Sequence, residues 1–199
     1  MGYSKAQKGR THKRIVAIAS KRFREKGLAR FGIAELMKEA GLTVGGFYKH
    51  FDSRDHLVAE AVSSAFGTWQ RQLDAAESGG PPLSYEKLID EYLHEAHRDN
   101  PGTGCAISAL AGEIARSDKR TRALASEEIR NNLKLIAGLL PCKDKRVARS
   151  NAIITYSALV GAMSLARAVS DEALSREILK TVAVLLKNSA PEQQKIKRA

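Results

Sequence analysis

Glycine and proline residues divide the 199-residue chain into segments of helical length, and this punctuation limits the fold more than any other feature. Between the breaks, apolar residues recur every three or four positions, as Ile15, Ala19 and Phe23 do. Apolar and polar residues do not alternate over any sustained stretch, and no Asn-Gly or Asp-Gly hairpin turn occurs. The sequence therefore predicts an all-α protein of about nine helices.

The apolar stripes and the residues that cap or stop them predict the bounds of these helices. In chain order, they cover about residues 11–26, 33–40, 43–50, 53–77, 85–97, 104–116, 119–139, 144–168 and 172–188. We expect a small head at residues 1–55, a larger body at 56–190 and a disordered tail at 191–199.

Positive charge is concentrated at the N-terminal end of the chain. The first 50 residues contain 12 lysines and arginines and 3 acidic residues, whereas the rest of the chain contains 21 and 19. A basic head on a near-neutral body is typical of a module that binds a polyanion, because lysine and arginine neutralise phosphates. The charge pattern therefore favours a protein that binds nucleic acid.

Other features exclude several classes of protein. Two cysteines provide neither a disulfide framework nor a cysteine-rich zinc site. The apolar run from Ile15 to Ala19 is too short for a signal peptide, and the uncharged stretch at 150–166 is too short and polar for a membrane span. We therefore expect a cytoplasmic protein that does not contact a membrane.

The stretch from Ile33 to Phe51 has the spacing of a helix-turn-helix: a short helix, a turn beginning at Gly41 and a second short helix that can enter a major groove. Gly45 and Gly46 remove side-chain bulk where the second helix begins, so that its backbone can approach DNA. Donors suited to phosphate oxygens and base edges follow within one turn, namely Tyr48, Lys49 and His50.

The segment 41–57, with the sequence GLTVGGFYKHFDSRDHL, resembles the DNA-binding signature of the tetracycline-repressor (TetR) family of bacterial transcription regulators. The resemblance is specific over about residues 11–62 and implies a dimeric, usually repressing regulator that leaves a palindromic operator when a small molecule binds its C-terminal domain. By position, it implies phosphate contacts from Thr43, Tyr48, His50 and Arg54, and a groove-facing surface made of Val44, Gly45, Gly46 and Lys49.

The last two predicted helices have more apolar surface than one core requires. The helix at 144–168 is apolar on most sides, and Gly161 in its middle suits close packing of a partner helix. Each stripe alone fits an intramolecular core, but the resemblance implies a four-helix interface between the two copies of a homodimer. Its candidate residues are Ser157, Gly161, Leu165, Ile178, Val182 and Leu185.

The helices between Tyr85 and Leu140 are apolar with few polar groups, which is typical of a pocket for a small molecule. We expect a hydrophobic or aromatic ligand. The candidate lining residues are Tyr92, His97, Cys105, Leu110 and Tyr156. Cys105 also lies at a predicted helix start, where the helix dipole stabilises a thiolate, so modification by an electrophile or oxidant is an alternative signal.

The sequence contains no nucleophile elbow, phosphate loop or dinucleotide fingerprint, so we expect no enzymatic activity and no cofactor. His94 and His97 lie three residues apart, but solvated or hydrogen-bonded histidines explain them better than a metal site. The alternative function from another class is a helical small-molecule-binding or catalytic protein whose basic head binds nucleic acid without sequence preference. A preferred palindrome would distinguish the two.

Overall fold

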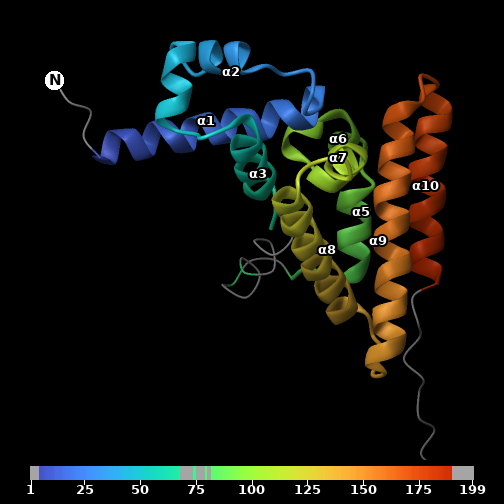
Figure 1. Cartoon of the computed structure of the whole chain (residues 1–199). Coiled ribbons are helices and arrows are strands. Elements are labelled where there is room, and N and C mark those ends of the chain that lie inside the picture. Colours follow the sequence, from blue (N-terminus) through green and yellow to red (C-terminus); the bar gives the residue numbers. More distant parts are fainter. Residues whose placement is uncertain (1–4, 68–73, 75–78, 80–81, 190–199) are drawn as a thin grey trace, which may run out of the picture. The chain divides into compact units, whose positions relative to one another are not determined.

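Figure 1 shows the computed structural model, which describes residues 5–67, 74, 79 and 82–189. These ranges contain nine α-helices, two 3-10 helices and no strand, so the predicted all-α class is confirmed. The elements are α1 (Lys5–Lys26), α2 (Ile33–Glu39), η1 (Val44–Lys49), α3 (Arg54–Ser64), α5 (Tyr85–Tyr92), α6 (Glu95–Asp99), η2 (Pro101–Thr103), α7 (Ala106–Ile114), α8 (Lys119–Leu139), α9 (Lys145–Ala168) and α10 (Glu172–Asn188). The tail at 191–199 lies outside the described residues, and none of the described helices is long and apolar enough to span a membrane.

The helices pack into two compact units that do not follow chain order. Unit 1 comprises the described residues of 1–66 and 100–127, and unit 2 comprises those of 67–99 and 128–199. The segment 100–127 therefore packs with the N-terminal helices, and the division between the units falls inside α8. The functional boundary expected after residue 55 stays a prediction.

Unit 1 is built around α1. The predicted stripe of Ile15, Ala19 and Phe23 is buried, and α1 packs against α2, α3, η2 and α7. The described part of the helix already includes Lys5, earlier than the start predicted near residue 11, because nothing in its exposed turns before residue 11 stops it and Gly9 costs only about 1 kcal/mol in a helix. It ends at Lys26, where Gly27 has a φ of 88° and stops the helix as predicted.

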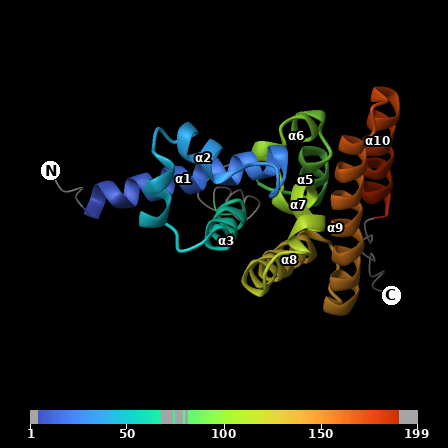
Figure 2. The ribbon, with the colours of Figure 1, turned by 45° about the horizontal axis from the view of Figure 1, so that its top comes forward.

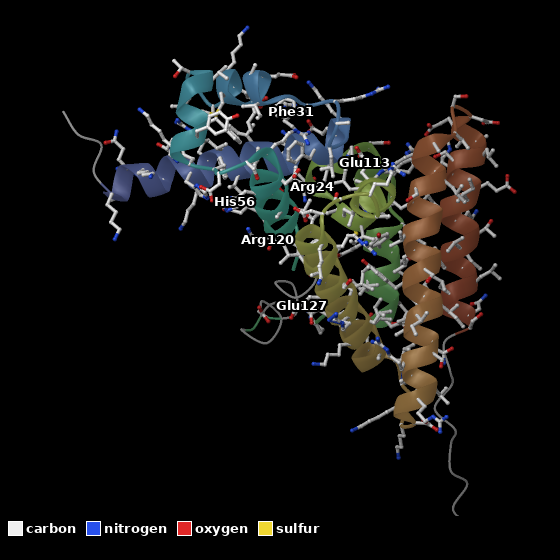
Figure 3. All side chains as sticks on the ribbon, in the orientation of Figure 1. Arg24, Phe31, His56, Glu113, Arg120 and Glu127 are labelled. Carbon is white, nitrogen blue, oxygen red and sulfur yellow. The ribbon has the colours of Figure 1, made fainter. Side chains whose placement is uncertain are left out.

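Two charged side chains fasten the end of α1 to the segment 100–113, and we call this contact the α1 anchor. The Glu113 carboxylate accepts the backbone N–H of Leu28 at 2.8 Å and that of Ala29 at 3.3 Å. Arg24 donates to the carbonyl oxygens of Gly102 and, at 3.2 Å, Gly104. Figure 3 labels Arg24 on α1 and Glu113 on α7. The α1 anchor joins residues that are about 80 positions apart in the chain.

Unit 2 is built on α9 and α10, which lie side by side in Figures 1 and 2 and also pack against α5. The helix predicted at 85–97 is in fact two helices, because the chain turns at Leu93 and His94. The Nδ1 atom of His94 accepts the backbone N–H of Ala96 at 3.0 Å and so caps α6. His94 and His97 therefore do not share one face of a continuous helix.

Arg98 joins α6 to α10 within unit 2. Only 9% of this residue is exposed. Its guanidinium donates to Asp99 at 2.7 Å, to the Ser175 hydroxyl at 2.9 Å and to Glu172 at 3.0 Å. The carboxylate of Asp99 is the main cause that raises the pKa of Arg98 above its ordinary value, so the side chain is cationic at every accessible pH.

Replacing Arg98 with alanine tests this connection. We expect the free energy of unfolding to fall by about 1–3 kcal/mol, because Ser175 and Glu172 lose a charged donor in a largely buried setting. Arg176→Ala is the matched control, since Arg176 is exposed and donates to the same Glu172 at 2.9 Å. The control should cost less than about 1 kcal/mol. Urea denaturation measures both, and equal losses would show that burial of Arg98 adds nothing.

Candidate nucleic-acid interface

The second helix of the predicted helix-turn-helix is η1, a 3-10 helix. The turn before it contains Gly41, whose φ of 67° reverses the chain after α2. Phe47 is fully buried, and its ring lies 5.3 Å from that of Phe51, centroid to centroid. These two aromatic rings, four residues apart in the chain, fix η1 to the core of unit 1.

The opposite face of η1 is exposed. Tyr48 is 70% exposed and Val44 51%, values that are high for an aromatic and a branched apolar side chain. Lys49 is exposed as well, and the hydroxyl of Thr43, at the N-cap position, makes no capping hydrogen bond. This face therefore presents apolar contacts and hydrogen-bond donors that the fold itself does not use.

The described part of the chain gives no reason for a glycine at position 45. Its φ is not positive, and a Cβ atom built there would meet nothing within 4 Å. At Gly46, a Cβ atom would lie 3.6 Å from Met37, which is ordinary van der Waals contact. Neither backbone strain nor internal packing requires these two glycines, in keeping with the prediction that a partner approaches the backbone here.

His50 ends η1 and is half-buried. Its Nδ1 atom is buried, and no described residue hydrogen-bonds to it. Burial is the main cause that lowers the pKa of His50 below its ordinary value, and the charges of His12, Lys8 and Lys49 lower it further. The imidazole is therefore neutral at neutral pH.

Arg54, at the start of α3, is directed into unit 1. Its guanidinium donates to the carbonyl oxygen of Leu28 and lies 5.9 Å from the centroid of the Phe23 ring. Ser53 caps α3, as predicted, by accepting the backbone N–H of His56 at 3.0 Å. The phosphate contact of Arg54 stays a prediction, and in this structure its side chain holds the head together.

One group of polar residues at the interface was not predicted. Glu60 on α3 lies within 2.6 Å of His12 on α1 and 2.9 Å of His56 on its own helix. The four-residue spacing of His56 and Glu60 is visible in the sequence, but the contact from α1 is not. Among the described residues, no cluster of histidine, cysteine or acidic side chains is arranged to hold a metal ion.

The candidate ligand residues separate into two groups. Tyr92 and Tyr156 line one small cavity of about 10 Å³ in unit 2, and His97 lies against Tyr92 with ring centroids 4.7 Å apart. Cys105 and Leu110 belong to unit 1. Cys105 is the half-buried N-cap residue of α7, and its thiol makes no capping hydrogen bond.

Polar atoms give this cavity some hydrogen-bonding capacity. Asn132, which the sequence did not single out, donates to the Tyr156 hydroxyl at 3.3 Å. His97 donates from Nδ1 to the Tyr92 carbonyl oxygen at 2.6 Å. Burial is the main cause that lowers the pKa of His97, and the charge of Arg167 adds to it, so this ring is also neutral at neutral pH. The other side chains around the cavity are Leu88, Leu135, Ile136 and Leu159.

The candidate dimer residues form an exposed apolar surface on α9 and α10. Leu165 and Leu185 are each 58% exposed. Of the other candidates, Ser157 is exposed, whereas Gly161, Ile178 and Val182 are half-buried. Ile154 and Leu174, which are not among the candidate interface residues, are exposed apolar residues that extend the two stripes by helical spacing.

Comparisons with known proteins agree with the predicted family. A family model described as bacterial regulatory proteins, tetR family, matches residues 15–61. No curated protein matches the sequence. Several solved structures are similar in fold. The reduced form of NemR from E. coli has a TM-score of 0.71 and 20% sequence identity, covering 92% of this chain and 98% of its own.

Two further structures are similar over nearly the whole chain. A TetR-family transcriptional regulator from Cytophaga hutchinsonii has a TM-score of 0.73 and 19% identity, covering 96% of this chain and 100% of its own. A TetR transcriptional regulator from Chloroflexus aurantiacus has a TM-score of 0.71 and 23% identity, covering 92% and 96%. At such identities the structures establish the fold, and the family model identifies its N-terminal helices. Residues 15–61 therefore belong to the tetR family of bacterial regulatory proteins, and the chain as a whole has the fold of TetR-family transcriptional regulators.

Proposed function

We propose that this protein is a homodimeric repressor that binds a palindromic operator through η1 and leaves it when a small molecule binds unit 2. The observation that carries the proposal is the exposed face of η1. Tyr48 and Val44 are exposed there, and Gly45 has neither a backbone nor a packing reason to be glycine. Hydrogen-bond donors and apolar groups beside a backbone without side-chain bulk are suited to contact base edges and phosphates in a major groove.

A two-fold protein reads a two-fold operator, because each head then meets one half-site. The exposed apolar stripes of α9 and α10 support such a pairing. Leu165 and Leu185, each 58% exposed, would be removed from water if a second copy packed on these stripes. Gly161 lies within the α9 stripe, and a Cβ atom there would meet nothing within 4 Å, so a second copy can approach closely. The homodimer interface proposed here consists of these two helices from each copy.

The cavity between Tyr92 and Tyr156 is the proposed ligand site. Its volume of about 10 Å³ is much smaller than the roughly 300–1,000 Å³ of an ordinary ligand pocket, so a ligand requires the helices around it to separate. The lining is apolar apart from two tyrosines and Asn132, which favours a hydrophobic or aromatic compound with one or two polar atoms. Such a compound releases DNA only if it binds better to a state of the protein that cannot bind DNA than to the state that can.

A thiol at Cys105 offers a different signal. Cys105 is the N-cap residue of α7 and is half-buried, so a small reagent can reach its sulfur. In this version an electrophile or oxidant modifies the sulfur and changes the packing of α7 within unit 1. For either signal we expect the protein to act in the cytoplasm and assign it no catalytic role.

The first prediction concerns the exposed face of η1. Selection from a random DNA pool should recover a palindromic duplex. Tyr48→Ala should weaken binding to every duplex by about 1 kcal/mol, roughly fivefold, because a phosphate contact carries no sequence information. Lys49→Ala should instead change which base is preferred, by about 1–3 kcal/mol. Fluorescence anisotropy on the recovered duplex and its single-base variants measures both.

Matched variants separate DNA contact from folding. Gly45→Ala should weaken operator binding while thermal stability is kept, whereas Gly112→Ala, at an equally open glycine of α7, should leave operator binding unchanged. Lys134→Ala removes an exposed lysine of unit 2 and controls for the loss of charge at Lys49. Operator affinity that is unaltered in Tyr48→Ala, Lys49→Ala and Gly45→Ala would remove η1 from the interface. Recovery of no preferred palindrome would favour non-specific binding of nucleic acid.

The second prediction concerns the dimer. Leu185→Glu places a charge in the proposed interface, where burying it carries a large cost, so the variant should sediment as a monomer with intact helix content. Val184→Glu is the control, because Val184 is also exposed but lies on another face of α10, beside Leu93 and Lys180. Analytical ultracentrifugation compares the two. A Leu185→Glu protein that stays dimeric would place the interface elsewhere.

The third prediction separates the two signals. Cys105→Ser should keep release from the operator by a reversible hydrophobic compound and lose release by an electrophile. Cys142→Ser is the control, since Cys142 is the chain's other thiol and lies beside the carbonyl of Asp144, outside unit 1. Anisotropy of a labelled operator reports release. If neither class of compound releases the wild-type protein, both versions of the signal are wrong.

A further inference from the structure

Three of the five histidines in the chain gather at the C-terminal end of η1. Glu60 of α3 lies between two of them, with Oε2 at 2.6 Å from Nε2 of His12 and Oε1 at 2.9 Å from Nε2 of His56. An ionised carboxylate only accepts hydrogen bonds, so both rings donate through Nε2. The backbone N–H of Asp52 lies 3.4 Å from Nδ1 of His56, which fits this assignment. We call His12, Glu60 and His56 the Glu60 network; Figure 3 labels His56.

The Glu60 network reaches η1 through a column of aromatic rings. The His12 ring stacks on Phe51, with centroids 4.6 Å apart and planes inclined by 28°. Phe51 in turn packs on Phe47, the buried residue of η1, at 5.3 Å. The centroid of His12 lies 6.0 Å from that of His50. Glu60 thus fixes His12 at a position beside His50, the C-cap residue of η1.

The environment of His50 determines which of its nitrogens can donate. A proton on the buried Nδ1 atom would find no acceptor among the described residues, so the neutral ring carries its proton on Nε2. Burial lowers the pKa of His50, and nearby positive charges lower it further. The titratable and charged groups around the ring are Lys8 and His12 of α1, Lys49 of η1, His56 and Glu60 of α3, and Asp52 between them.

We propose that His12 and Glu60 are positioning residues for DNA binding, which fix the His50 ring so that its Nε2–H group meets a phosphate oxygen. The proposal rests on the phosphate contact proposed for His50, and neither positioning residue needs to touch DNA itself. The proposal adds to the exposed face of η1 two residues on neighbouring helices, His12 of α1 and Glu60 of α3.

The proposal has a consequence for pH. A bound phosphate favours the protonated ring, so the pKa of His50 is higher in the complex than in the DNA-free protein. DNA affinity therefore rises as the pH falls through that range and levels off below the pKa of the DNA-free protein. Because the charge of His12 lowers the pKa of His50, His12 also sets the pH at which this rise begins.

Variants of the 199-residue chain test the proposal on a labelled mixed-sequence duplex, with affinity measured from pH 5.5 to 8.5 at fixed ionic strength. His12→Gln should move the midpoint of the rise upward by about 0.5 pH unit, the effect of removing one charge 6.0 Å away through water. Glu60→Gln keeps the shape of the side chain but not its charge, and should weaken binding about threefold or more as His12 loses its anionic acceptor. His94→Gln removes a histidine of unit 2 and should change neither quantity.

A merely structural role predicts a different outcome. If His12→Gln leaves the midpoint where it is in the wild type, or if Glu60→Gln binds like the wild type at every pH, the proposal is overturned. NMR titration of the DNA-free protein gives a second test: His12→Gln should raise the pKa of His50, because it removes one of the positive charges that lower it. An unchanged His50 titration would also overturn the proposal. Because neither measurement needs an operator, failure to find a palindrome contradicts the proposed function alone.

Discussion

The carboxylate of Glu113 accepts two backbone N–H groups in the turn that follows α1, and the arrangement of unit 1 depends on this contact. These N–H groups follow a glycine with positive φ, where the chain cannot continue as a helix. Arg24 adds a second charged contact from α1 to the same segment of chain. With its C-terminal end held in this way, α1 offers one fixed face to α2 and α3 and, through His12, to the end of η1.

The position of η1 is therefore determined by the helices and side chains that pack against it. A 3-10 helix of six residues has too few backbone hydrogen bonds to be stable alone, so its geometry follows from what it packs on. Phe47 and Phe51 provide the apolar contact, and the Glu60 network ties α1 to α3 and holds the His12 ring against Phe51. Arg54, whose position suggests a phosphate contact, instead ties α3 to the turn after α1. Most of the side chains that hold η1 in place therefore lie outside its exposed face.

The two proposed effector sites, Cys105 and the cavity between Tyr92 and Tyr156, lie in different units. Cys105 begins a helix that packs with the head, so modification there acts within the unit that contains η1. The cavity of Tyr92 and Tyr156 lies in unit 2, and α8, which lines it, begins in unit 1. A ligand that displaces α8 thus acts on a helix common to both units.

Local features were predictable from the sequence, whereas long-range ones were not. Gly27 ends α1 and Ser53 caps α3 as expected, because each depends on neighbours within four residues. The break at His94 was missed because a histidine cap has no strong sequence signature. The Glu60 network and the α1 anchor join residues 48 and 85 positions apart, and no helical periodicity contains that information.

At the interface, spacing identified the exposed residues of η1, and the resemblance to the family supplied their roles. The direction of the Arg54 side chain could not be predicted in this way, because a motif fixes the position of a residue in the chain and leaves its rotamer to the tertiary contacts. The same holds for Asn132, which became a cavity residue only through the packing of α8 against α9 residues.

The composite make-up of unit 1 has a consequence for the order of events on the ribosome. The first 66 residues contain the whole helix-turn-helix, yet the segment that completes their packing ends at residue 127. At a synthesis rate of about 5–20 residues per second, the missing partner is made roughly 3–12 seconds later. During that interval the residues of α1 that will meet α7 are uncovered, and the backbone N–H groups of Leu28 and Ala29 lack their acceptor, Glu113. Unit 1 therefore gains its final packing only after more than half of the protein has been made.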